Sequence, residues 1–247
     1  MRRPRTGRSA AEDAAYDLLI DLGFPLPLDA GAVRRHLGLE IRQEALPQRV
    51  RGLLLVPERL IVVRRGLGPH AEAHVVLHEC GHHRLPEHKA LLYRCSIFDL
   101  DPRVRRRMEA EANAFATVLR FGPVPDGWVD AEPPSIERVH ELADMAGASF
   151  ESALRWFVAE TERPVWALVC DAPPAGRDGP GTTPMVRVRY GYRSPTATPR
   201  AWPAVVPAGL PPTRSDWAPE LSGYRTAGAT AAQAWATAYS TCVLLWG

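Results

Sequence analysis

The stretch His78-Glu79-Cys80-Gly81-His82 decides how this chain of 247 residues is interpreted. It matches the pattern H-E-x-x-H, which forms a metal site when it lies on a helix. Pro69 opens a helical pattern that carries through His83, and Pro86 forbids its continuation. At about 3.6 residues per turn, side chains four apart share one face of a helix. The two histidines can therefore reach one ion, and the glutamate projects beside that ion rather than onto it.

A second predicted helix supplies carboxylates for a third ligand. Asp101-Pro102 is a helix cap followed by a proline at the first helical position, and apolar residues then recur on one face to about Arg120. Catalytic zinc sites use three protein ligands and keep one position open. We favour Glu109 as the third ligand and keep Glu111 as the fallback. Asn113 follows Glu109 by one turn, where its amide can hold the orientation of the Glu109 carboxylate.

Histidines are concentrated around the motif, since six of the eight lie between His70 and His88. We interpret those outside the motif as surface groups or as side chains that support the ligands. His83 and His140 stay open as hydrogen-bond donors to a substrate carbonyl oxygen. The supporting candidates are His70, His74, His83 and His88.

Composition excludes several classes of protein. With 30 basic and 28 acidic side chains, the formal charge of +2 gives no electrostatic footprint for nucleic acid, so direct binding is not expected. The basic run Arg103 to Arg107 is short and is interpreted as a solvated helix face. No apolar run reaches the roughly 18 residues of a membrane span, and no secretory signal is recognised. The expected location is the cytoplasm.

The four cysteines are expected to be free thiols, because the cytoplasm keeps cysteines reduced. Cys80 lies next to the two metal-binding positions but points away from their face. We interpret it as a small buried hydrophobe, with a redox role as the alternative.

Residues 10–160 carry the signals of helices and one hairpin. Apolar spacing predicts helices over Ala10–Leu22 and Ala30–Leu37. Two apolar runs, Gly52–Val56 and Leu60–Val63, predict a β-hairpin. The edge of strand 60–63 is expected to accept an extended substrate segment by main-chain pairing.

The rest of the chain is richer in proline. Twelve of the 24 prolines fall between Pro164 and Pro219, which forbids long helices there and favours short strands joined by turns. We therefore place a domain boundary near residue 163.

A helix pair precedes this boundary. It covers Ser135–Ala146 and Ser149–Glu160, and the small-residue turn between the helices is typical of a helix-turn-helix. A DNA-binding regulator is thus an alternative. The second helix presents Glu151, Arg155 and Glu160 as its charged groups, a poor surface for phosphate. We prefer structural packing of the pair against the metal-site domain.

The segments His78–His83 and Glu109–Ala116, with the apolar continuation Val118-Leu119, resemble the ImmA/IrrE family of metallopeptidases. The resemblance covers residues 10–162. It implies a gluzincin-like, cytoplasmic zinc protease that inactivates a helix-turn-helix repressor by cleaving it. One Zn²⁺ ion per chain would be held by His78, His82 and Glu109, with Glu79 as the general base.

This chain departs from the family where the second motif usually continues into Leu-Leu-Met-Pro. It has Arg120-Phe121-Gly122-Pro123 after Leu119. The ligands are untouched, but the wall beside the cleft is expected to differ.

We therefore expect an α+β fold in two parts. Residues 1–163 would form a zincin-like metalloprotease domain, with a hairpin or small sheet, the H-E-x-x-H helix, the glutamate-bearing helix and the helix-turn-helix-like pair at about 134–160. Residues 164–247 would form a proline-rich, β-rich domain, a candidate sensor or regulatory domain.

The expected function is that of a zinc endopeptidase acting on a helix-turn-helix repressor under stress or signal control. The alternative is a regulatory module that binds DNA or protein and keeps a zinc site without proteolysis.

Overall fold

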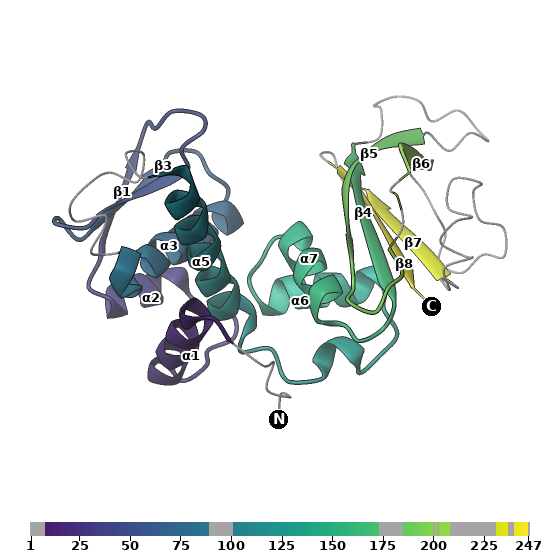
Figure 1. Ribbon diagram of the computed structural model, residues 1–247, viewed down its shortest axis with the longest axis horizontal. Coiled ribbons are helices and arrows are strands. Elements are labelled where there is room, and N and C mark those ends of the chain that lie inside the picture. The colour runs from purple at the N-terminus through teal and green to yellow at the C-terminus, as the bar shows by residue number, and fades with distance from the viewer. Residues whose placement is uncertain are drawn as a thin grey trace. The chain divides into compact units, whose positions relative to one another are not determined.

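The computed structural model describes residues 8–88, 101–172, 185–199, 201, 203–207, 231–236 and 240–246. The architecture is mixed α+β, as the sequence predicts, with one sheet in each of two compact units (Figure 1). The first unit comprises Met1–Pro125 and Asp144–Ser149, and the second comprises Asp126–Ala143 and Phe150–Gly247.

The first unit combines a small sheet with several helices. Their bounds are α1 (Ala10–Leu22), α2 (Ala30–His36), β1 (Glu40–Glu44), β2 (Gly52–Leu55), β3 (Leu60–Arg64), α3 (Pro69–Arg84) and α5 (Pro102–Phe121). The two predicted helices at the start of the chain, the hairpin and both motif-bearing helices are confirmed to within about two residues at each end.

The sheet has the order β1-β3-β2, with β1 parallel and β2 antiparallel to β3. Ile61 in β3 faces Ile41 on one side and Leu54 on the other. The prediction that strand 60–63 offers an edge to substrate is therefore wrong, because β3 is hydrogen-bonded on both sides. Strand β1 was not predicted, because its five residues are all exposed and show no apolar alternation.

Helices α3 and α5 pack against each other, and α1 packs against α5 (Figure 1). Their contact surfaces are apolar, with Leu19, Leu77, Phe115 and Leu119 almost wholly buried. Burial of such side chains supplies about 1.5 to 3 kcal/mol each before entropy losses. This packing fixes the position of one motif-bearing helix against the other.

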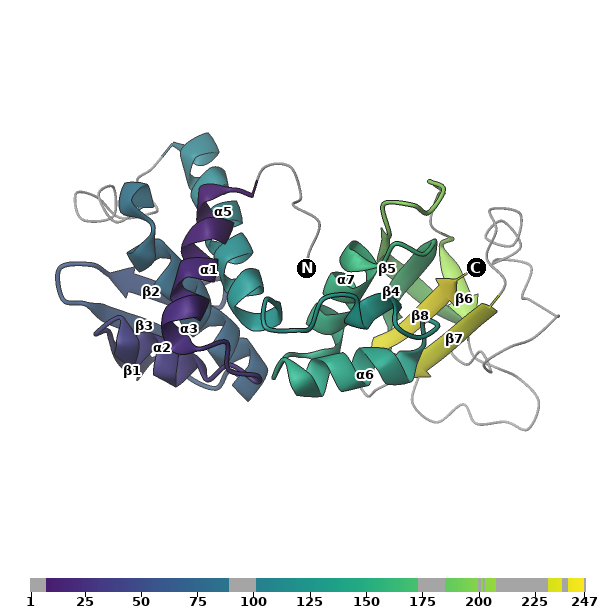
Figure 2. The same cartoon turned by 90° about the horizontal axis from the view of Figure 1, so that it is seen from below.

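The second unit is built on an antiparallel sheet of order β6-β5-β4-β8-β7 (Figure 2). Residues 165–170 of β4 are all buried, as expected for a central strand covered on both faces. The expected β-rich character of residues 164–247 is confirmed for the described residues. The elements are η2 (Trp128–Asp130), α6 (Ile136–Met145), α7 (Phe150–Glu160), β4 (Val165–Asp171), β5 (Met185–Arg193), β6 (Val205–Pro207), β7 (Ala231–Ala236) and β8 (Ser240–Trp246).

The helix pair α6–α7 belongs mainly to this second unit, which corrects the expected boundary at residue 163. Helix α7 packs on β4 and β5, which belong to the same unit. Its Glu151 accepts a hydrogen bond from the Tyr190 hydroxyl, and Arg155 lies 6.0 Å from the centre of the Tyr192 ring. The proline content changes at residue 163, but the boundary between the units does not lie there. The apolar face of α7, before residue 163, packs on β4, which follows it.

Among the described residues, we find no helix that combines the length and apolar character needed to cross a membrane.

The short helix α2 depends on its N-cap, Asp29, whose carboxylate accepts hydrogen bonds from the N–H groups of Gly31 and Ala32 at 2.8 and 3.0 Å. The Gly31 N–H is the main reason that the pKa of Asp29 lies below its usual value. Because the native pKa is the lower one, the stabilisation is complete above the unfolded-state pKa. It is lost as the pH falls through the native pKa.

Asp29→Ala is therefore expected to lower the free energy of unfolding by about 1 kcal/mol near neutral pH, the usual cost of a lost N-cap. Urea unfolding at pH 7 and again below pH about 4 should show this difference shrinking in acid. Asp21→Ala, at an exposed position in the last turn of α1, is the matched control and should stay within about 0.5 kcal/mol of wild type. An equal loss in both variants would contradict the capping role.

Candidate metal centre

Helix α3 carries the two motif histidines on one face, one turn apart. It begins with Gly68 as N-cap and Pro69 in its first turn, and it ends at Arg84. The imidazole Nε2 atoms of His78 and His82 lie 3.1 Å from each other. The rings meet edge to face, with 4.8 Å between their centres. Two ring nitrogens therefore face one point beside the helix.

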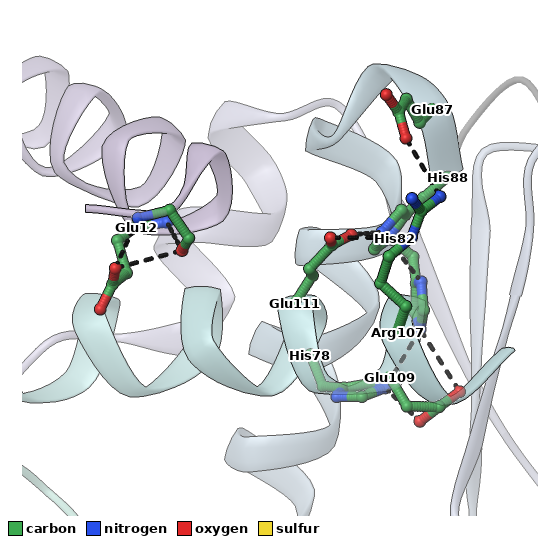
Figure 3. A network of polar contacts seen from close by, with 9 residues as sticks. Glu12, His78, His82, Glu87, His88, Arg107, Glu109 and Glu111 are labelled. Carbon is green, nitrogen blue, oxygen red and sulfur yellow. Dashed lines mark hydrogen bonds and ion pairs between the residues drawn. The ribbon is translucent and has the colours of Figure 1, made fainter. Parts of the chain in front are cut away.

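Helix α5 brings the third donor to the same point (Figure 3). The carboxylate of Glu109 places Oε2 at 3.2 Å from His78 Nε2 and Oε1 at 3.7 Å from His82 Nε2. One donor atom from each of the three residues can be chosen so that all lie within 4.8 Å of one another. The group can hold a metal ion, with Glu109 as the third ligand.

The donor separations fit a bound ion. Donor atoms about 2.0 to 2.1 Å from a tetrahedral ion lie about 3.3 to 3.4 Å from one another. The two Nε2 atoms are 3.1 Å apart, and each lies near an oxygen of Glu109, at 3.2 Å from Oε2 for His78 and 3.7 Å from Oε1 for His82, all close to that value.

Gly81 explains how α5 comes so close to α3. A Cβ atom at this position would lie 3.1 Å from Phe115 Cδ1 and 3.3 Å from the Ala112 Cα. These are tighter contacts than side chains ordinarily make, and the Ala112 atom belongs to backbone that cannot move without its helix. A side chain at Gly81 would therefore require Phe115 and the backbone of α5 to shift by a few tenths of an ångström.

Each metal-facing histidine has a partner at its other nitrogen. Asn113 Oδ1 lies 3.2 Å from His78 Nδ1 and can accept a hydrogen from it. This corrects the expectation that Asn113 orients Glu109, because its amide reaches across to α3. His74, with its ring centre 6.3 Å from that of His78, joins this side of the centre, and burial lowers its pKa to about 4.

His82 is supported by a second histidine. His82 Nδ1 lies 3.1 Å from His88 Nδ1, and His88 Nε2 lies 2.6 Å from Glu111 Oε2. His88 is 1% exposed. Glu111, the fallback ligand of the sequence analysis, is therefore engaged by His88 and does not join the three donors.

Glu79 lies buried on α3 beside this group, with 7% of its surface exposed. Burial raises its pKa to about 7, the charge of Glu109 adds to the rise and His78 opposes it. Strand β2 passes close by, since a Cβ on Gly52 would lie 3.1 Å from Glu79 Oε1 and 2.3 Å from a methyl group of Val75. Only glycine fits there, and the carboxyl group is enclosed between strand and helix.

Several candidate residues lie elsewhere. His83 is buried on α3 and is not one of the three donors. His70 Nδ1 lies 3.1 Å from the Gly147 carbonyl oxygen. His140 belongs to the second unit, where its ring packs 4.6 Å from that of Phe150.

Arg120 begins the segment in which this chain departs from the ImmA/IrrE sequence pattern, and its side chain makes a specific contact. Arg120 is buried, and its Nη1 donates to the Gly147 carbonyl at 2.6 Å. The same carbonyl is the partner of His70. The turn between α6 and α7, which belongs to the first unit, is thus held by side chains from both motif-bearing helices.

The sequence placed His88 among the surface or supporting groups, and it is a supporting group. Its link to His82 and Glu111 was missed, because Pro86 breaks the helical register between it and the motif. The signal that could have found it is the clustering of histidines up to residue 88 together with a second glutamate on α5.

No family model and no curated protein matches this sequence. Among solved structures, the chain is similar to a Mycobacterium tuberculosis transcriptional regulator, at 16% identity and a TM-score of 0.43. The match covers 65% of this chain and 51% of the other, so the chain spans about half the length of that structure. What fold and site define on their own is an α+β protein with a candidate metal centre of two histidines and one glutamate.

Glu109→Gln is expected to weaken metal binding by at least about 100-fold, because loss of a ligand should cost no less than the 10- to 100-fold typical of outer-shell partners. Metal content after dialysis and competition with a chromophoric chelator measure the effect. Glu72→Gln, in the first turn of α3, the helix that carries the two histidines, is the control and should bind as wild type. Equal metal content in both variants would remove Glu109 from the centre.

Cys80 is expected to react slowly with iodoacetamide in the folded protein. It is fully buried, and burial raises its pKa to about 12, so little thiolate is present at pH 8. Labelling mapped by mass spectrometry should be at least about 100-fold slower than in denaturant. Fast labelling of the folded chain would revive the redox role. Cys170 and Cys242 are also free and buried, and Cys95 lies outside the described residues.

Proposed function

We propose that this chain is a zinc-dependent endopeptidase of the ImmA/IrrE type. Its substrate would be a helix-turn-helix transcriptional repressor, cleaved under stress or signal control. The observation that carries the proposal is the buried Glu79, which neighbours His78 on α3 and lies beside the donor group His78, His82 and Glu109.

Zinc is the metal that this donor set favours. Two imidazoles and one carboxylate form a ligand set found in catalytic zinc sites, where a fourth position stays open. The group offers three protein donors, and both histidines can keep their hydrogen on Nδ1 and a lone pair on Nε2. One ion per chain would be held.

Zinc, when bound, supplies a Lewis acid that makes a water available as hydroxide near neutral pH. Glu79 would accept the proton of the attacking water and pass it to the leaving nitrogen of the peptide bond. A pKa raised to about 7 suits both transfers, because the carboxylate can take up a proton and release it again at neutral pH.

The strand available for an extended substrate is β2. It lies at an edge of the described sheet, and its first residue, Gly52, adjoins the Glu79 carboxyl group. A substrate segment that pairs with this edge would be held by main-chain hydrogen bonds, with little demand on its sequence. This replaces the expectation that β3 binds the substrate.

The second unit contributes none of the three donors. A sensor or regulatory role for it is consistent with the proposal. The cytoplasmic location and the absence of direct DNA binding remain part of the proposal. The side chains Glu151 and Arg155 of α7 support the latter, because both contact tyrosines of β5 instead of forming a basic surface.

Glu79→Gln is expected to keep zinc and to lower the cleavage rate by about 10²- to 10⁴-fold, the usual contribution of a general base. The substrates to use are helix-turn-helix repressors from the same organism, starting with any that is encoded beside this chain, and cleavage is followed by gel and mass spectrometry. Wild type stripped of metal by a chelator should be inactive and should recover with added zinc.

Glu72→Gln again serves as a control and should cleave at the wild-type rate. Cleavage by Glu79→Gln at that rate would rule out the base. No zinc-dependent cut by the wild-type chain in any candidate repressor would favour the alternative, a regulatory module that keeps the metal site without proteolysis.

A further inference from the structure

His88 and Glu111 form a partly buried pair on the side of His82 that faces away from the metal-binding point (Figure 3). Three segments meet here, since His82 lies on α3, His88 follows Pro86 and Glu111 lies on α5. The side chain of Glu111 is 35% exposed, whereas that of His88 is 1% exposed. The pair thus connects a carboxylate near the surface to His82 Nδ1, the nitrogen that does not face the metal-binding point.

Glu111 determines which nitrogen donates and which accepts in the hydrogen bonds from Glu111 through His88 to His82. An ionised carboxylate only accepts hydrogen bonds, so His88 Nε2 must carry the hydrogen that Glu111 receives at 2.6 Å. In a neutral imidazole the other nitrogen is then a lone pair. His88 Nδ1 therefore accepts, and the atom that donates to it is His82 Nδ1, 3.1 Å away.

This hydrogen-bond order determines the protonation of His82 Nε2, the atom that would bind the metal. With its hydrogen on Nδ1, neutral His82 has a lone pair on Nε2, the atom that faces His78 and Glu109. The opposite tautomer would place a hydrogen on Nε2 and block the ion. In that tautomer His82 Nδ1 and His88 Nδ1 would also be two lone pairs facing each other at 3.1 Å.

A purely structural explanation is that the pair satisfies a buried histidine. Glu111 alone would do that for His88 Nε2, and any carbonyl could serve the other nitrogen. The partner here is instead a ring nitrogen of a ligand residue. His78 has a matching arrangement with the Asn113 oxygen at its Nδ1, so both ligand imidazoles have an acceptor behind them.

We propose that His88 and Glu111 are positioning residues that hold His82 in the tautomer and ring orientation that a metal ion requires. Glu111 sets the direction of the hydrogen bonds, and His88 transmits it to His82. The inference concerns metal binding by the first unit and holds whether or not the chain is a protease.

The test compares two substitutions of similar size at residue 88. His88→Leu removes the acceptor, and zinc affinity is expected to fall by about 10- to 100-fold. His88→Gln offers a side-chain oxygen to His82 Nδ1 and should recover most of that loss, to within about tenfold of wild type. Affinity is measured by competition with a chromophoric chelator, after urea unfolding has shown that both variants fold.

Glu111→Gln provides a second, milder change at a partly exposed position and is expected to cost about tenfold. Combined with His88→Leu it should add almost nothing, because Glu111 then has no ring to direct. Glu87→Gln is the matched control, since Glu87 adjoins His88 in sequence and pairs with Arg107, which also lies 3.9 Å from Glu111. Its zinc affinity should equal that of wild type.

A readout that packing alone would not move is the tautomer of His82 in the metal-free protein. Nitrogen-15 NMR of the ring should show the hydrogen on Nδ1 in wild type and in His88→Gln, and a shift toward Nε2 in His88→Leu. Folded His88→Leu protein with wild-type affinity, or an unchanged His82 tautomer in it, would overturn the proposal. Equal losses in the leucine and glutamine variants would overturn it as well.

Discussion

The close approach of α5 to α3 at Gly81 is the constraint on which the rest of the first unit depends. Where a Cβ would meet Phe115 and the backbone of Ala112, the absent side chain lets the two helices approach closely. Helix α5 then presents Glu109 to the histidines on one side and Glu111 to His88 on the other. Helix propensity alone would favour alanine at residue 81 by up to about 1 kcal/mol. Glycine at residue 81 is therefore explained by the short distance between α3 and α5 and not by the stability of α3 alone.

The features that the sequence predicted well are those with local causes. The capping residues Asp29 and Asp101 and the proline at position 102 mark the starts of helices, because each satisfies or removes a free N–H within its own turn. The histidines of the motif lie on one face of α3 for an equally local reason. The second helix offered Glu109 and Glu111 as carboxylates near its middle, and Glu109 was preferred because Asn113 follows it by one turn.

The features that the sequence did not predict arise between segments. The spacing of Asn113 from Glu109 indicated a contact on one helix, whereas the amide reaches His78 on another. Strand β3 was known to belong to a hairpin, but only its pairing with the exposed strand β1 puts it in the middle of the sheet. Helix α7 carries an apolar face whose partner, β4, follows in the chain, and periodicity says nothing about which surface a face will cover. In each case the missing information was a long-range contact.

The origin of the three donors in two different helices also links the metal ion to folding. In the unfolded chain His82 and Glu109 are separated by 26 intervening residues, so the complete donor set exists only after α3 and α5 have packed. An ion that binds the native chain and not the unfolded one adds to the free energy of unfolding, by about 2.7 kcal/mol at a free concentration 100 times its dissociation constant. The supply of metal ions would then set how much of the first unit is folded, and so how long the chain survives proteolysis by other enzymes.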